Sequence, residues 1–285
     1  MFKDLIALTK PNLLRLNVFA AFGGFWVASK WSFDWITFIW MIVGCTFTMA
    51  SATVLNNYWD RELDMKMERT KSRALPAGRM KPTHVLLYGI ILGIIGFSVL
   101  FFAVNVITGI LGVAGWIAYV VVYTMWLKRT STWSTSVGGI SGAMPPVIGY
   151  CAVSNEIDMG AILLFAFLFL WQPAHFWSLG IRRVEEYRAA GFLVLPVVKG
   201  IKRTNIQMIP YLVLLLVTVV LFTVYGYTGY FFLVISVALT LFWLIHTCTG
   251  FKAKDIDKWA KFNFLISVNY LLIVFIIMIV NTTRL

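Results

Sequence analysis

A long apolar segment ends in Asn56-Asn57-Tyr58-Trp59-Asp60-Arg61-Glu62-Leu63-Asp64, so these residues lie where a membrane helix meets water. Asn56, Asp60 and Asp64 are four residues apart and share one helical face. Two carboxylates at that spacing repel each other and weaken a helix by about 0.3 kcal/mol. A bound divalent cation reverses the sign of that interaction, and amide and carboxylate oxygens suit Mg²⁺. We therefore predict that Asn56, Asp60 and Asp64 are metal ligands.

Three cationic residues, Arg69, Lys71 and Arg73, follow this acidic ladder. Guanidinium groups match phosphate geometry, and Mg²⁺ is commonly shared between protein carboxylates and phosphate oxygens. The alternative is an ordinary charged helix end with pairs such as Glu62 and Lys66. The ladder followed directly by three cations favours a diphosphate site instead. We predict that these three cations and Asn57 bind the substrate that carries the diphosphate group.

The composition is that of a polytopic membrane protein. The chain has 285 residues, of which 60% are hydrophobic and 13% charged, whereas a soluble domain has about 45–50% apolar and about 25% charged residues. Nine segments are long enough to cross about 30 Å of hydrocarbon. They fall near residues 12–29, 35–57, 83–104, 106–126, 134–152, 160–181, 207–226, 229–247 and 263–282. We expect an all-α fold of nine transmembrane helices, forming one domain over residues 1–285.

The distribution of basic residues predicts the orientation of these helices. With the N-terminus inside, only Lys30 and Arg284 of the 24 lysines and arginines lie on the outer side, as the positive-inside rule requires. The net charge of +12 would suggest nucleic-acid binding in a soluble chain. Here the basic residues follow one membrane face, which argues against a nucleic-acid partner and for contact with membrane lipid.

Two inner loops, about 56–82 and 175–204, carry most of the remaining polar chemistry. They follow the second and the sixth predicted helix, so their places in the chain are matched, and both are expected to overhang one cavity. In the second loop, His175, Arg182 and Glu186 share a helical stripe with Leu179. Ionisable groups that leave a membrane helix in this way usually face a bundle interior.

Arg183 and Arg188 have an alternative interpretation as solvated arginines at a helix end. For His175 the alternative is a hydrogen-bonded structural histidine. The sequence leaves both alternatives open.

The first loop resembles the intramembrane aromatic prenyltransferases of the UbiA type. Their first signature matches Asn56-Asn57-x-x-Asp60-x-x-x-Asp64, and its continuation matches Arg69-x-x-x-Arg73-x-x-Pro76-x-Gly78. The second loop is similar to one branch, the protoheme IX farnesyltransferases or heme O synthases. That similarity rests on His175-Phe176-Trp177 and on Glu186-Tyr187-x-x-Ala190-Gly191-x-x-x-Leu195-Pro196-Val197-Val198. The resemblance covers the whole chain.

This resemblance implies an activity: the farnesyl group of farnesyl diphosphate is joined to a vinyl group of heme B, water adds, and heme O and diphosphate result. It also implies Mg²⁺ as cofactor, a central cavity that opens near the cytoplasmic face, and a place in the plasma membrane. A downstream heme-modifying enzyme or a terminal oxidase assembly is an implied partner.

The implied roles divide between the two loops. Asp60 and Asp64 hold the metal during catalysis, while His175 and Glu186 act at the heme. Arg182, Arg183 and Lys199 are expected to bind the heme substrate through its propionates.

The second loop departs from the pattern of the quinone-forming relatives, which carry two or three aspartates there. His175 and Arg182 stand in aspartate places, and Glu185-Glu186 is the remaining acidic pair. This difference argues against a full second metal site and against the alternative of a sister prenyltransferase for a quinone precursor. A secondary transporter is a further alternative, but transporter sites lie near mid-membrane, whereas these carboxylates cluster at one membrane edge.

Overall fold

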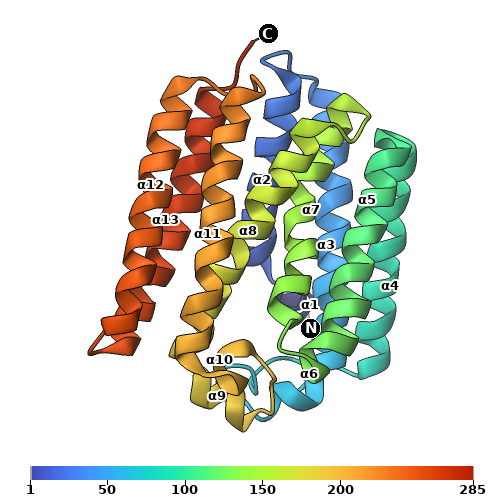
Figure 1. The fold of residues 1–285 in the computed structure, drawn as a ribbon. Helices are drawn as coiled ribbons and strands as arrows, with labels where there is room; N and C mark the ends of the chain where they lie inside the picture. The colour runs from blue at the N-terminus through green and yellow to red at the C-terminus, as the bar shows by residue number, and fades with distance from the viewer. Residues whose placement is uncertain (1, 285) are drawn as a thin grey trace.

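A computed structural model describes residues 2–284, and within this range the secondary structure is helical apart from one isolated β-bridge, Thr228–Thr282. The helices of the first half are α1 (Phe2–Leu8), α2 (Pro11–Ser29), α3 (Trp35–Asp64), α4 (Pro82–Ser98), η1 (Val99–Val104), α5 (Val106–Ile117), η2 (Ala118–Leu127) and α6 (Lys128–Thr130). The others are α7 (Ser134–Ser154), α8 (Met159–Arg182), α9 (Val184–Ala189), α10 (Leu195–Val198), α11 (Gly200–Val224), α12 (Tyr230–Thr249), η3 (Gly250–Lys252) and α13 (Ile256–Val280). The long helices run side by side as a bundle (Figure 1).

Within residues 2–284, eight helices are long and apolar enough to cross a membrane. The ninth predicted span is present as α2, a helix of 19 residues, but it is not among those eight. The all-helical membrane fold is therefore confirmed, whereas the crossing by α2 stays a prediction. Long helices suit lipid because every backbone N–H and C=O group within a helix is satisfied internally.

Several of these helices begin at polar caps that the sequence supplies. Asp34, Asp158 and Asp255 accept hydrogen bonds from the first turns of α3, α8 and α13, and Asn105 does so for α5. A side-chain acceptor at this position satisfies a backbone N–H group that has no partner within the helix. These caps therefore fix where each of these helices begins.

One end of the bundle gathers the charged segments. Figure 1 shows α1, α6, α9 and α10 at or toward the same end, which is also where α3 finishes at Asp64. The two polar loops and the N-terminal helix thus share one end, as the distribution of basic residues predicted. This end is where the candidate active site forms.

The α2 and α7 helices pack with their backbones in close contact. A Cβ atom added at Gly149 would lie 1.9 Å from the carbonyl oxygen of Ala21, and one added at Gly24 would lie 1.9 Å from that of Pro146. Only glycine allows this approach, as in other tightly packed membrane helix pairs. The contact holds α2 against α7 within the bundle.

We expect Gly149→Ala to destabilise the protein by about 1–3 kcal/mol, because the new methyl group forces the two backbones apart. The measurement is the thermal unfolding midpoint of the detergent-solubilised protein. Gly139→Ala on the same helix is the matched control, since its Cβ would lie an ordinary 3.4 Å from the Phe169 ring. Equal midpoints for the two variants would contradict this account of the packing.

Candidate active site

The predicted ladder forms one buried row at the end of α3. Asn56, Asp60 and Asp64 are exposed by only 3%, 1% and 4%, and α3 remains helical as far as Asp64. The helix continues seven residues beyond the predicted end at residue 57, so all three side chains keep the helical spacing. The Asn56 amide donates to Asp60 Oδ2 at 2.8 Å, which links the first two members directly.

Three cationic side chains from different parts of the chain converge on this row. Lys128 Nζ donates to Asp60 Oδ2 at 2.5 Å, and Arg73 donates to Asp64 Oδ2 at 2.7 Å. Lys10 Nζ donates to Asn56 Oδ1 at 2.6 Å. Arg73 was predicted as a substrate-binding residue, whereas Lys10 and Lys128 were not among the predicted site residues.

The cluster therefore holds more positive than negative charge. Two carboxylates face three cationic groups, and burial together with the neighbouring charges of Arg73 and Lys128 lowers the pKa of Lys10 to about 7. The lowered pKa means that the protonated form of the Lys10 amine is disfavoured in these surroundings. An anion bound among these side chains would relieve that penalty.

The arrangement also suits a hard divalent cation. Asp60 Oδ1 is buried and has no hydrogen-bond partner among the described residues. Within residues 2–284 no group of three or more His, Cys, Asp or Glu side chains forms a metal cluster. Two carboxylates and one amide nevertheless match Mg²⁺, which commonly takes one or two protein carboxylates and completes its shell with phosphate oxygens and water.

A π-helical segment, η2, positions Lys128 beside Asp60. Residues Ala118–Leu127 adopt this wider helix directly before Lys128, and Thr124 Oγ1 within it accepts from the Asn56 amide at 3.1 Å. π-Helical turns are rare and are frequent at functional sites. Here the turn aligns a hydroxyl and an ammonium group with successive members of the ladder.

The other predicted residues of the first loop lie outside the carboxylate row. The Asn57 side chain donates to the backbone oxygens of Leu8 and Thr53, which ties α1 to α3, and it also lines a cavity of about 240 Å³ with Lys10 and Arg73. Lys71 is exposed and pairs with Glu68. Arg69 is exposed as well. Their roles in substrate binding stay predictions.

The two predicted loops pack against each other, while the expectation that both overhang one cavity stays a prediction. Phe192 of the second loop lies over Lys128, 4.8 Å from its Nζ atom. Met67 of the first loop packs with Ala190 and Phe192 in a small buried cluster. Gly191 has a φ of 79°, a conformation that glycine adopts without strain, and it turns the chain after α9 so that Phe192 reaches this place.

The predicted stripe from His175 to Glu186 is wrong as a single helical face. Helix α8 ends at Arg182, Arg183 departs from helical geometry with a φ of −118°, and Glu186 belongs to the separate helix α9. A six-residue helix after such a break has its own direction. His175 and Glu186 are therefore positioned independently.

His175 faces α13 through a polar and an aromatic contact. Its Nδ1 atom lies 2.7 Å from Ser267 Oγ, and the ring is stacked between Trp171 and Phe264 at centroid distances of 4.3 and 4.7 Å. Ser267 already donates its hydroxyl proton to the Phe264 carbonyl, so His175 donates from Nδ1 to Ser267. The lone pair of Nε2 is then available, and Nε2 has no hydrogen-bond partner among the described residues.

The remaining candidates of the second loop separate from one another. Arg182 reaches Asp257 at 3.4 Å, while Arg183 reaches Glu186 at 3.4 Å. Glu186 Oε1 is buried and has no hydrogen-bond partner in the described structure. Lys199 lines a second cavity of about 390 Å³. The structure thus places one predicted heme-side residue, Lys199, in a pocket and two in ion pairs.

Lys10 and Lys128 could not be found from local patterns. They lie 46 and 68 residues from their partners Asn56 and Asp60. Their position is the feature of the sequence that could have indicated them, because each is a lysine at the inner end of a predicted span. Many lysines share that feature, so it does not single them out.

Comparison with known proteins places the chain in a family. The model of the UbiA prenyltransferase family matches residues 17–269. Protoheme IX farnesyltransferase 1 of Bacillus subtilis (strain 168) is 45% identical over 98% of this chain and 90% of its own length. The protoheme IX farnesyltransferase of Enterobacter sp. (strain 638) is 42% identical over 94% of this chain and 91% of its own.

Solved structures show the same fold at lower identity. A digeranylgeranylglyceryl phosphate synthase structure has a TM-score of 0.85 at 19% identity and covers 100% of this chain and 99% of its own. A UbiA homolog from Archaeoglobus fulgidus bound to DMAPP and Mg²⁺ has a TM-score of 0.62 at 17% identity, covering 93% and 97%. The chain belongs to the UbiA prenyltransferase family and groups within it with the protoheme IX farnesyltransferases.

Proposed function

We propose that this protein transfers the farnesyl group of farnesyl diphosphate to a vinyl group of heme B, with addition of water, to give heme O and diphosphate. The bond between C1 of the farnesyl group and the diphosphate oxygen breaks. A bond forms from C1 to the terminal vinyl carbon, and water adds to the inner vinyl carbon and releases a proton. The resemblance of both loops and the sequence relatives support this reaction.

The observation that carries the proposal is the charge of the buried cluster. Lys128 and Arg73 balance the carboxylates of Asp60 and Asp64. Lys10, whose protonated form a bound anion would favour, then adds one positive charge. One Mg²⁺ ion brings the excess to three, which matches the three negative charges of a fully ionised prenyl diphosphate. Electrostatic groups of this kind accelerate ionisation because they stabilise charge that grows on the leaving group.

The side chains divide this work. Asn56, Asp60 and Asp64 would hold Mg²⁺, which, when bound, neutralises part of the charge on the diphosphate. Arg73, Lys128 and Lys10 donate hydrogen bonds toward the same place, so they can orient the diphosphate and stabilise it as it leaves. The packing of Phe192 over Lys128 covers the cluster with an apolar ring and helps to exclude water.

His175 is proposed to act at the heme. The hydrogen bond from Nδ1 to Ser267 leaves Nε2 able to accept a proton from the adding water or to bind the heme iron.

We also propose that the charged end of the bundle faces the cytoplasm, that all nine predicted helices span the plasma membrane, and that a central cavity opens toward this end. The distribution of basic residues supports this orientation.

The direct test is to incubate membranes containing the protein with heme B, farnesyl diphosphate and Mg²⁺ and to detect heme O by mass spectrometry. Membranes without the protein and reactions with a chelator are the controls. Absence of heme O together with prenylation of an aromatic acid would instead support the quinone-forming alternative.

Arg73→Ala should raise the KM for farnesyl diphosphate by about tenfold, because it removes a charge-assisted donor from the diphosphate, while the KM for heme changes little. Each substrate is titrated at saturating levels of the other. Lys66→Ala is the matched control, since Lys66 is an exposed cation of the same loop. A defect confined to heme would show that the two loops have been assigned to the wrong substrates.

His175→Ala and Glu186→Gln should each lower the ratio of heme O formed to diphosphate released, because both residues are proposed to act after the diphosphate has left. The ratio is measured at saturating Mg²⁺, alongside the heme absorption spectrum. His84→Ala serves as control, because His84 is an exposed histidine on α4. Ratios equal to that of the wild type in both variants would contradict the assignment of His175 and Glu186 to the heme side of the reaction. A loss of diphosphate release in Glu186→Gln would place Glu186 on the metal side.

A further inference from the structure

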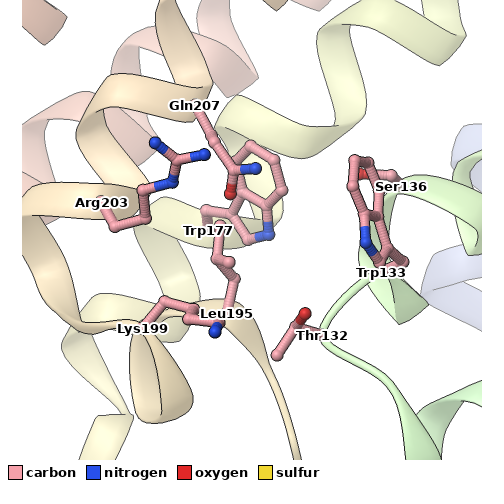
Figure 2. A pocket seen from close by; sticks show the side chains of 8 residues that line it. All are labelled: Thr132, Trp133, Ser136, Trp177, Leu195, Lys199, Arg203 and Gln207. Carbon is pink, nitrogen blue, oxygen red and sulfur yellow. The ribbon is translucent and has the colours of Figure 1, made fainter.

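A second cavity lies at the charged end of the bundle, between the starts of α7 and α11. It has a volume of about 390 Å³. Its lining residues are Thr132, Trp133, Ser136, Trp177, Leu195, Lys199, Arg203 and Gln207. Figure 2 shows Arg203, Gln207 and Lys199 on one side of this pocket and Trp133 and Ser136 on the other, with Trp177 between them.

Several polar groups of the pocket lack partners. Trp177 is exposed by only 3%, yet its Nε1 atom is buried with no hydrogen-bond acceptor, and Gln207 Oε1 is also buried and unpaired. Among residues 2–284, Lys199 and Arg203 form no ion pair. Buried polar atoms are normally satisfied, so an unpaired indole donor beside two free cations indicates a ligand that supplies negative oxygen atoms.

The architecture of the pocket is built by its helices. Arg203, Gln207 and Tyr211 follow one another at four-residue spacing on α11, and Tyr211 closes the row by donating to Ser136 Oγ at 2.9 Å. Gly200 has a φ of 78°, which glycine tolerates, and it turns α10 into α11 so that Lys199 and Arg203 lie at the same mouth. The Trp177 ring meets the Tyr211 ring edge-on at 5.6 Å and forms the apolar wall.

The pocket adjoins the carboxylate cluster through a short piece of chain. Lys128, which pairs with Asp60, is only four residues before Thr132, so the two Cα atoms are at most about 14 Å apart. Leu195 follows three residues after Phe192, which lies over Lys128. The segment that contains Phe192 and Leu195 therefore contacts both the carboxylate cluster and the pocket.

We propose that this pocket binds the two propionates of the heme substrate, with Lys199 and Arg203 as cationic partners and Trp177 Nε1 as a further donor. The assignment rests on the proposed function. The propionates and the vinyl groups leave opposite edges of the porphyrin, so a propionate site must lie one ring width from the farnesyl C1 atom. The pocket lies at most about 14 Å from Lys128, measured between the Cα atoms of Lys128 and Thr132, which allows that separation. Its Trp133 and Trp177 offer aromatic surface for the macrocycle.

The test uses the full chain in phosphatidylcholine nanodiscs, and heme B binding is followed by its absorption spectrum in the absence of farnesyl diphosphate. The double variant Lys199→Gln/Arg203→Gln should bind heme about tenfold more weakly, since Lys199 and Arg203 are exposed and an exposed ion pair contributes at most about fivefold. Lys202→Gln, which changes the neighbouring exposed cation on α11, should stay within about twofold of the wild type. The KM for farnesyl diphosphate should not change in any of these variants.

The dimethyl ester of heme B, in which the propionates carry no charge, is the matched ligand. It should bind the wild type about as weakly as heme binds the double variant, and it should bind both proteins equally. A double variant that binds heme like the wild type, or a wild type that does not distinguish heme from its ester, would overturn the proposal. A wild type that distinguishes them but makes no heme O would support the propionate pocket and reject the proposed reaction.

An anionic lipid headgroup offers similar chemistry and is distinguished by a second set of nanodiscs that contain phosphatidylglycerol. If propionates occupy the pocket, the tenfold difference between the wild type and the double variant appears in both sets of discs. If the double variant instead loses bound phosphatidylglycerol by native mass spectrometry while its heme affinity is unchanged, the pocket belongs to lipid and the proposal is wrong.

Discussion

Replacing Asp60 by asparagine should lower heme O formation by about a hundredfold or more, and Asp64→Asn should do the same. Each change removes a negative charge from the place where Mg²⁺ is expected, while the shape of the side chain is kept. The measurement is heme O formation at limiting Mg²⁺ in membranes that contain equal amounts of each protein. Part of the loss should return as Mg²⁺ is raised, because a weakened metal site is filled by mass action.

Glu62→Gln provides the control for this experiment. Glu62 lies on the same helix, two residues from Asp60, but its side chain is 69% exposed and pairs with Arg61 at 3.5 Å. Its activity should stay close to that of the wild type. Wild-type rates in both aspartate variants at limiting Mg²⁺ would contradict the assignment of the ladder to a metal-bound diphosphate.

The second large effect is expected at Lys128, a residue that no sequence motif identified. Lys128→Gln should lower kcat/KM for farnesyl diphosphate by about tenfold to a hundredfold, because the change removes a charge-assisted donor from the diphosphate site. The same change leaves the buried Asp60 carboxylate without its ammonium partner, and breaking a buried pair in this way costs about 3 kcal/mol. Activity is therefore compared at equal amounts of folded protein, and the melting temperature is measured in parallel.

Arg129→Gln is the control for Lys128. Arg129 is the next residue in the chain, but it is exposed and donates to the Trp59 carbonyl rather than to a carboxylate. It should retain its kcat/KM for farnesyl diphosphate. If Lys128→Gln changed the KM for heme alone, Lys128 would belong to the heme side, and the charge count of the cluster would have to be revised.

The places where prediction and structure differ have a common cause. The expected stripe from His175 to Glu186 assumed that α8 continues without a break, but the chain leaves helical geometry at Arg183. His175 lies within α8 and contacts Ser267 on α13, a residue 92 positions away in the chain. Neither the break nor the partner produces a local signal, because the break belongs to a loop that packs on the first loop and the partner lies on a helix that packs against α8.

Local periodicity determined the helical membrane bundle and the register of Asn56, Asp60 and Asp64. Hydropathy sets which segments enter lipid, and a spacing of four residues sets one helical face, so neither result needs a distant contact. Tertiary structure decided which cations meet these carboxylates, how His175 is oriented and where the pocket of Lys199 and Arg203 forms. Those features depend on which helix faces pack together across dozens of residues, and the energy of that packing is spread over the whole bundle.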